Sequence, residues 1–332
     1  MTGSGNLQAV GHDDGIDDEI LQHHTLLVSV IVPTYNRAHL IGRTLDSILK
    51  QAYTNLELII VDDGSTDATE SVVAAFSAAS HFPVRYHKKN NGGCSSARNL
   101  GVSLATGGAL AFLDSDDEWH PDAIGNLVRV LEHSGADFVY SPCFSQMKKG
   151  RFVSYPAAAG HPELFAVEHF MTTRACPCSI LYRKHIFAVC RNDESLLYNE
   201  DSDFLQRVAI AFRAAYLETP TAVVHYHEAN KSSNRVEIGR ALLKSAENVL
   251  RDFPAFHKQL GPLARQRVAV IVAELAGALI MEKRYGEALA LGAGYRLGAV
   301  EKLSIFLETR HLVRASRLAG RLACRVRELL AG

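Results

Sequence analysis

The chain has 332 residues, of which 47% are hydrophobic and 21% are charged, and its formal net charge is −1. This composition is ordinary for a globular protein with one large domain and a smaller addition, and the near-neutral charge gives no reason to expect nucleic acid as a partner. No apolar run approaches the roughly twenty residues that span a bilayer, and the first residues lack a basic flank before an apolar core, so we expect a cytoplasmic protein.

The six cysteines are scattered and do not have the paired spacing of a zinc site. Cys176-Pro177-Cys178 is too tight for the usual zinc knuckle. We therefore expect buried free thiols in a reducing compartment. The cysteines are Cys94, Cys143, Cys176, Cys178, Cys190 and Cys324.

Residues 1–24 are rich in glycine and acidic side chains, and we expect a disordered leader there. The apolar run 26–32 predicts a first strand that Pro33 stops. Apolar residues then recur at steps of three and four over residues 40–49, which predicts a helix that packs one face on a sheet.

A second apolar run, residues 56–61, ends in Asp62-Asp63-Gly64, and helical spacing follows it. A third predicted strand, residues 84–87, leads into the glycine-rich segment 90–99. The glycines there allow close approach of the backbone to a ligand, and the following helix start together with Arg98 could bind a phosphate.

The apolar run 109–113 ends abruptly in Asp114, Asp116 and Asp117. It predicts a buried strand that delivers carboxylates to the edge where open α/β sheets bind ligands. Three neighbouring carboxylates repel one another unless a cation neutralises them, which favours a divalent ion such as Mg²⁺ or Mn²⁺. The alternative is an exposed acidic turn that caps the next helix.

A helix from Pro121 and a strand over 136–140 complete four strand–helix alternations, which indicate a mostly parallel sheet with helices on both faces. Residues 141–175 lose any period, and we expect a variable loop region there. A strand over 179–182 and a last strand over 221–227 are predicted, and acidic residues gather at the start of the helix between them.

From residue 236 the sequence has helical spacing and no strand pattern, which predicts an all-helical extension. Its last part places arginines three or four residues apart on one face. That helix could lie on an anionic membrane surface or pack on a partner, or its arginines could form a solvated face. The arginines are Arg310, Arg314, Arg317, Arg321 and Arg325.

Four blocks in this order resemble the inverting family 2 glycosyltransferases of the GT-A fold. They are Val28-Ser29-Val30-Ile31-Val32-Pro33-Thr34-Tyr35-Asn36, Val61-Asp62-Asp63-Gly64-Ser65-Thr66-Asp67, Asn91-Gly92-Gly93 with Ala97-Arg98-Asn99, and Leu113-Asp114-Ser115-Asp116-Asp117. The resemblance continues less specifically to about residue 233. It implies a catalytic domain over 25–235, with a nucleotide-binding half (25–121) and an acceptor half (122–235), before the extension 236–332.

The resemblance also implies roles for residues in the nucleotide-binding half. Asp116 is expected to be the direct metal ligand of a DXD motif, and Asp114 is expected to contact the ribose or the metal. Asp63 corresponds to the acid that accepts from the base, and the Pro33-Thr34-Tyr35 turn is expected to pack on the base. Arg98 either lies near the nucleotide or braces the glycine-rich loop.

In the acceptor half, Glu200-Asp201 matches the acidic pair of the family. We expect Asp201 to be the general base, with Glu200 as the alternative, whereas helix capping would account for one of them at most. His227 resembles a late histidine near the diphosphate or the metal, although a structural role is equally open.

The resemblance implies metal-assisted transfer of a sugar, with inversion, from a nucleoside diphosphate donor of the UDP type to an acceptor hydroxyl. The acceptor would be a carbohydrate or a lipid-linked or protein-linked glycan in the synthesis of a surface polysaccharide or glycoconjugate, at the inner face of the cytoplasmic membrane if the basic helix binds there. The alternatives are a sugar nucleotidyltransferase, which would need a basic glycine-rich loop where residues 33–36 stand, and a non-catalytic module that binds a nucleotide sugar.

Overall fold

The computed structural model describes residues 26–295 except 148–149, 155–158, 174–176 and 227–233. The expected leader, His227 and the arginine-rich segment 310–325 lie outside these residues.

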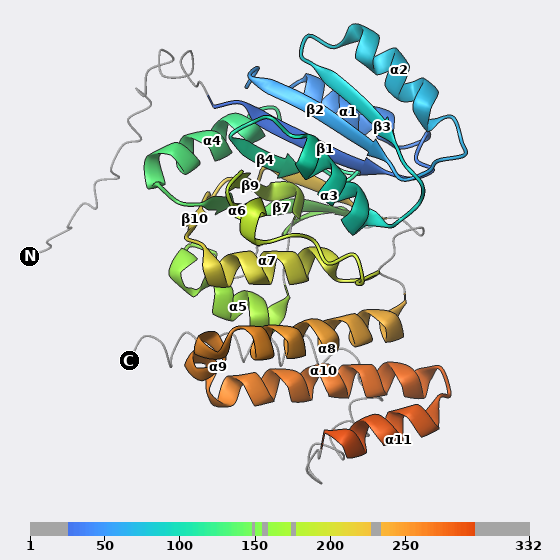
Figure 1. Ribbon diagram of the computed structural model, residues 1–332, viewed down its shortest axis with the longest axis vertical. Helices are drawn as coiled ribbons and strands as arrows, with labels where there is room; N and C mark the ends of the chain where they lie inside the picture. The colour runs from blue at the N-terminus through green and yellow to red at the C-terminus, as the bar shows by residue number, and fades with distance from the viewer. Residues whose placement is uncertain (1–25, 148–149, 155–158, 174–176, 227–233, 296–332) are drawn as a thin grey trace, which may run out of the picture.

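A seven-stranded sheet forms the centre of the described chain, in the spatial order β10-β6-β9-β4-β1-β2-β3 (Figure 1). All neighbouring pairs are parallel except those of β9, which runs antiparallel to both β4 and β6. The predicted mostly parallel sheet is therefore confirmed. Its strands are β1 (Val28–Thr34), β2 (Leu56–Asp62), β3 (Val84–Lys88), β4 (Ala109–Phe112), β6 (Phe138–Tyr140), β9 (Ile180–Arg183) and β10 (Ala214–Tyr216).

Helices cover both faces of this sheet because its strands are apolar on both sides. In β1, Val30 and Val32 face one core and Ile31 faces the other. The first core is completed by α1 (Ile41–Leu49), α2 (Thr69–Ala79) and α4 (Ala123–Ser134). The second is completed by α3 (Cys94–Leu104), the short α6 (Ile186–Val189), α7 (Glu200–Ala211) and the first residue of α5 (Phe165–Thr172).

A second sheet of four strands lies beside the first, in the order β5-β11-β7-β8. Our expectation that residues 141–175 form an irregular loop region is wrong in the described part, because β7, β8 and α5 lie there. The strand β7 pairs with β11, almost eighty residues further along the chain, and local periodicity cannot reveal such a partner. The strands are β5 (Glu118–Trp119), β7 (Cys143–Met147), β8 (Gly150–Ser154) and β11 (Ala222–His225), and 3₁₀ turns lie at Pro162–Leu164 and Pro177–Ser179.

The helical extension is present in the structure and stacks in successive layers below α7 and α5 (Figure 1). It consists of α8 (Arg235–Asp252), α9 (Pro254–Leu260), α10 (Pro262–Met281) and α11 (Tyr285–Gly294). These helices share one apolar core with Val167, Phe170 and Met171 of α5, which joins them to the sheet domain. None of the described helices combines the length and the apolar character that a bilayer crossing requires.

Cysteine chemistry differs from the expectation at Cys143. Cys143 is disulfide-bonded, so the expectation of free thiols throughout is wrong there. Cys178 and Cys190 are buried thiols, as expected, and burial raises the pKa of each.

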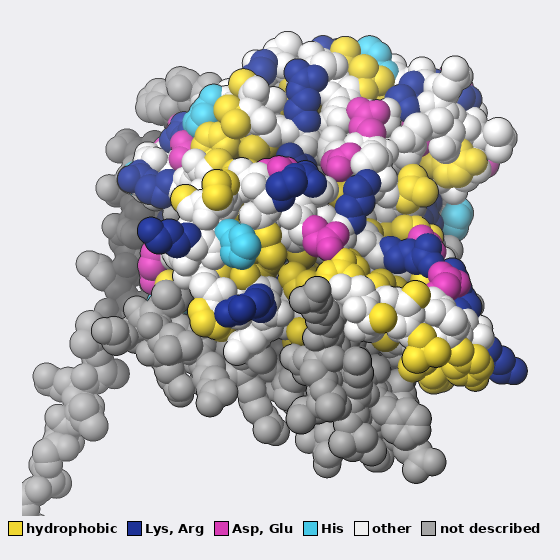
Figure 2. Space-filling model, turned by 60° about the horizontal axis from the view of Figure 1, so that its bottom comes forward, with side chains coloured by type: hydrophobic (Ala, Val, Ile, Leu, Met, Phe, Trp, Pro, Cys, Tyr) yellow, Lys and Arg dark blue, Asp and Glu magenta, His cyan; other side chains and the backbone are white. Residues whose placement is uncertain are grey.

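Basic and acidic side chains alternate over the described surface that Figure 2 shows. On that face they do not separate into large areas of one sign, in keeping with the net charge of −1.

Candidate active site

A cleft of about 420 Å³ opens at the carboxyl ends of β1, β2 and β4, and parts of α3, α7 and α8 also line it. The predicted site residues converge on this cleft although they come from segments more than 160 residues apart. Those that line it are Pro33, Thr34, Tyr35, Asp63, Arg98, Asp114, Asp116, Glu200 and Asp201. His227 lies outside the described residues.

The acidic segment after β4 forms a tight turn, in which the Asp117 amide donates to the Asp114 carbonyl (3.0 Å). Asp117 is buried and its carboxylate accepts the His225 amide of β11 (3.0 Å). Burial and the neighbouring Asp114 raise the pKa of Asp117 well above its usual range. Asp117 therefore ties the turn to the second sheet, whereas Asp114 and Asp116 are left as the more accessible acids, with side chains 38% and 17% exposed.

Two arginines hold Asp116, and the sequence analysis assigned a role to neither. Arg37 Nη2 lies 3.6 Å from the Asp116 carboxylate, and Arg43 donates to its carbonyl (2.7 Å). Arg37 follows the turn after β1 and itself lines the cleft. One signal in the sequence could have identified Arg37 as a site residue. It is a basic residue close to a segment that is expected to bind a diphosphate.

Arg98 lies at the centre of the acidic cluster. Its side chain is 4% exposed, and Nη2 donates to Asp114 (2.8 Å) while Nη1 lies 3.8 Å from Glu200. Burial disfavours the charged guanidinium, but the charges of Cys94, Asp114, Glu200 and Asp201 outweigh it and raise the pKa of Arg98. Nε and Nη1 have no hydrogen-bond partner among the described residues, so two buried donors remain available at the cleft.

Asp63 organises the glycine-rich segment before α3. Its carboxylate accepts the amides of Gly92 (2.9 Å) and Gly93 (2.7 Å) and the ammonium of Lys89 (2.7 Å). The Asp63 amide donates to the Thr34 carbonyl (2.8 Å), which holds the ends of β1 and β2 together. Gly93 has φ 89°, a conformation that favours glycine.

Glu200 and Asp201 form the first turn of α7, directly after Asn199, whose φ is 58°. The Asp201 carboxylate accepts the amide of Ser202 (2.7 Å), so one of its oxygens is partly occupied. Glu200 faces Arg98 instead. The acidic pair thus lies on the wall of the cleft that the acceptor half contributes.

Other cleft residues were missed by the sequence analysis because no local motif marks them. Tyr198, Tyr226 and Ile238 line the cleft from three separate segments of the chain. Ile238 belongs to α8, so the helical extension contributes part of the wall.

The carboxylate oxygens in the cleft suit a divalent cation that takes few of its ligands from the protein. Within the described chain no group of three His, Cys, Asp or Glu side chains comes close enough to hold a metal. Asp114 and Asp116 nevertheless line one cleft two residues apart, and Mg²⁺ is commonly bound by one or two carboxylates together with substrate phosphates.

Comparison with known proteins relates part of this chain to one family. Residues 29–192, just under half of the chain, match the family Glycosyl transferase family 2. Glycosyltransferase GlyG from Streptococcus pneumoniae serotype 4 is 33% identical over 151 residues, which are 45% of this chain and 50% of that protein. The matched region thus spans half the length of this relative.

Two solved structures share the fold. The S. aureus TarS 1-349 structure in complex with UDP-GlcNAc has a TM-score of 0.60 at 21% identity and covers 87% of this chain and 81% of that one. Mannosyltransferase PcManGT from Pyrobaculum calidifontis, in complex with GDP-Man and Mn²⁺, has a TM-score of 0.58 at 21% identity, with 88% and 86% covered. At this identity the likeness shows the GT-A fold alone.

Proposed function

Because residues 29–192 match the family Glycosyl transferase family 2, we propose that this chain transfers a sugar, with inversion, from a nucleoside diphosphate donor to an acceptor hydroxyl. The observation that carries the proposal is the convergence of Asp63, Asp116 and Asp201 on one cleft. If these acids lay on separate surfaces, no single cleft could hold both the sugar donor and the general base.

The donor binds, in this proposal, across the carboxyl ends of β1, β2 and β4. Tyr35 is 48% exposed at the cleft and stacks on the base, while Pro33 and Thr34 pack beside it. Asp63 accepts from the base, and Asp114 contacts the ribose or the metal. Arg98 and Arg37 supply positive charge where the diphosphate lies.

We propose a UDP-type donor, since TarS, which shares the fold, was solved with UDP-GlcNAc and with UDP. Mn²⁺ or Mg²⁺ is the proposed cofactor, as PcManGT was solved with Mn²⁺. Asp116, with Asp114 and His227, would hold the ion, which when bound neutralises negative charge on the diphosphate. The remaining steps depend on side chains of this chain.

Asp201 is the proposed general base, with Glu200 as the alternative. It removes the proton of the acceptor hydroxyl as that oxygen attacks the anomeric carbon opposite the leaving diphosphate, so one in-line displacement inverts the configuration. Arg98 stabilises charge between the two halves of the site, because it lies beside both Asp114 and Glu200.

The acceptor is proposed to be a carbohydrate or a lipid-linked or protein-linked glycan. The reaction would then belong to surface polysaccharide or glycoconjugate synthesis in the cytoplasm, with the basic segment 310–325 as the proposed contact with the membrane.

A panel of UDP-, GDP- and dTDP-sugars tests the function without knowledge of the acceptor. With Mn²⁺ present, slow release of nucleoside diphosphate by water as acceptor is measured along with donor affinity. Asp116→Ala should abolish Mn²⁺-dependent donor binding, whereas Asp201→Asn should retain binding and lose turnover. Asp46→Ala, at an exposed position on α1, is the matched control. Absence of both binding and turnover across the panel would refute the proposed function.

A further inference from the structure

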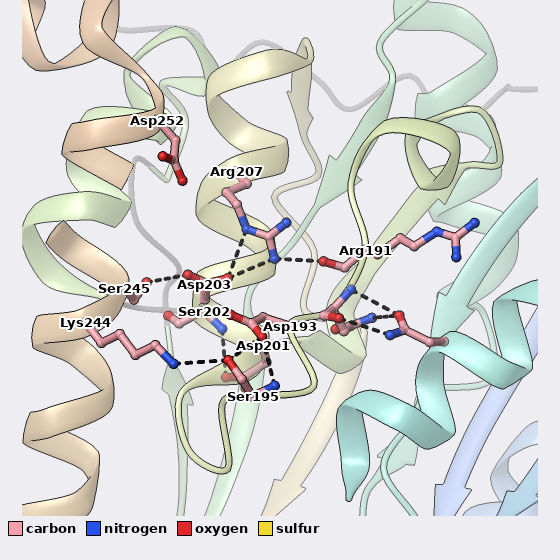
Figure 3. A network of polar contacts seen from close by, with 12 residues as sticks. Arg191, Asp193, Ser195, Asp201, Ser202, Asp203, Arg207, Lys244, Ser245 and Asp252 are labelled. Carbon is pink, nitrogen blue, oxygen red and sulfur yellow. Dashed lines mark hydrogen bonds and ion pairs between the residues drawn. The ribbon is translucent and has the colours of Figure 1, made fainter. Parts of the chain in front are cut away.

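The first turn of α7 lies between the sheet domain and the helical extension. Phe204, Leu205 and Val208 pack into the core below the central sheet. Figure 3 shows α8 on the other side, with polar side chains that bridge the two helices. The helix that carries Glu200 and Asp201 is therefore held from two directions.

The strongest bridge involves Asp203, which is 3% exposed. One carboxylate oxygen accepts the hydroxyl of Ser245 on α8 (2.7 Å), and the other accepts Arg207 Nε (2.9 Å) and Nη2 (2.8 Å). Arg207 also donates to the carbonyl of Arg191 (2.8 Å). Both oxygens of this buried carboxylate are thus satisfied, and one of the partners comes from the extension (Figure 3).

A second bridge holds the segment before α7. Lys244 of α8 donates to the hydroxyl of Ser195 (3.0 Å), and Ser195 in turn donates through its amide and hydroxyl to Asp193. The amide of Asn192 donates to Asn99 of α3 (3.1 Å). The approach to α7 is therefore fixed between α3 and α8.

We propose that α8 positions the general base: Asp203, held between Ser245 and Arg207, fixes the first turn of α7 and with it the carboxylate of Asp201. Asp203 and Ser245 are positioning residues, since they act through Asp201. The inference rests on the proposed function, because it takes Asp201 as the base.

The physical reason is that the first turn of a helix is its least constrained part. Its amide groups lack intrahelical acceptors, and three acidic side chains repel one another within this turn. Catalysis requires the base to stay within a fraction of an ångström of its productive position. A buried carboxylate anchored from α8 supplies that constraint two residues from Asp201.

Ser245→Ala removes the bridging hydroxyl without adding bulk. Its matched control is Ser103→Ala, an exposed position on α3 whose hydroxyl donates to the nearby Leu100 carbonyl (2.7 Å). The substrate is the sugar nucleotide of the panel that the unaltered chain hydrolyses fastest with Mn²⁺. We expect kcat for hydrolysis to fall roughly tenfold in Ser245→Ala, with the donor KM unchanged, and both to stay unchanged in Ser103→Ala.

A mutant cycle shows whether Ser245 acts through Asp203. In an Asp203→Ala background, Ser245→Ala should cause no further fall in kcat, because the hydroxyl has lost its acceptor. Additive effects, or equal losses in kcat and in donor affinity, would overturn the inference.

Hydrogen exchange tests the inference independently of turnover. The amide of Asp203, which donates to the Asn199 carbonyl (3.0 Å), and the amides of residues 204–207 in the next turn of α7 should exchange faster in Ser245→Ala than in the unaltered chain or in Ser103→Ala. Unchanged exchange there overturns the inference even when the unaltered chain turns donor over, whereas failure of the proposed function would appear as an unaltered chain that neither binds nor hydrolyses any donor.

Discussion

Arg37 Nη2 lies 3.6 Å from the carboxylate of Asp116, the proposed metal ligand, in the wall of the cleft. A basic side chain thus occupies part of the space around the acid that a cation would use. The arrangement implies that metal and Arg37 compete for Asp116, and that a diphosphate relieves the competition by attracting both.

The first prediction concerns this competition. Arg37→Ala should strengthen Mn²⁺ binding several-fold in the absence of donor, because it removes a positive charge about 4 Å from the metal ligand. Electron paramagnetic resonance of free Mn²⁺ measures the change. The same substitution at Arg129, an exposed residue of α4 whose side chain donates to Asn126 (3.1 Å), should leave the affinity unchanged. An unchanged affinity in Arg37→Ala would contradict the competition.

The second prediction concerns Arg98. Arg98→Met should lower the free energy of unfolding by about 3 kcal/mol at pH 7, because it leaves the charges of Asp114 and Glu200 without their buried counterion. Urea unfolding at pH 7 measures the effect. Arg98→Lys, which keeps the charge, should be closer to the unaltered chain, and equal losses in Arg98→Met and Arg98→Lys would argue against this account.

The third prediction concerns Glu57 at the opposite end of the sheet. Burial would raise its pKa, but hydrogen bonds from Ser29 (2.5 Å) and Thr106 (2.6 Å) and the charge of Arg85 lower it overall. A depressed folded-state pKa contributes stability above the unfolded value of about 4.3, and this stability is lost as the pH falls through the folded value.

Glu57→Gln should therefore lower the free energy of unfolding by about 2 kcal/mol at pH 7, and this loss should become smaller below pH 4. Thermal unfolding across this pH range measures it. Glu218→Gln, at an exposed position, is the control and should show no such dependence. A cost that stays constant with pH would show that shape rather than charge matters at this position.

The fourth prediction concerns the packing of α3 on β1. A Cβ at Gly101 would lie 2.4 Å from Ile31 Cγ2, so Gly101→Ala should destabilise the fold by about 2 kcal/mol. On α1, a Cβ at Gly42 would meet nothing within 4 Å, and Gly42→Ala should stabilise by about 0.5–1 kcal/mol. Urea unfolding compares the two, and similar effects at both positions would refute the packing argument.

Local pattern was sufficient for much of the fold. The apolar runs that became β1, β2 and β4 are buried throughout, and each is followed by the polar residues that line the cleft. Parallel strands with intervening helices must place their carboxyl ends at one edge, so the grouping of Asp63 with Asp114 followed from order along the chain. The roles of these residues stay predictions.

Pattern was insufficient where a contact joins distant segments. The strand β7 exists because β11 pairs with it, and Asp117 turns inward because the His225 amide meets it there. Both contacts join groups whose separation in the sequence carries no period. Cys143 is disulfide-bonded, contrary to the expectation of free thiols.

The sequence by itself determined the alternation of strands and helices, the acidic residues at the strand ends and the helical nature of the extension, since all three depend on neighbours within a few turns of the chain. Only the tertiary structure decided that α8 meets α7, that Ser245 reaches Asp203 and that Arg37 faces Asp116. These pairs form because packing buries surfaces from remote segments together, and the free energy of that burial has no local signature.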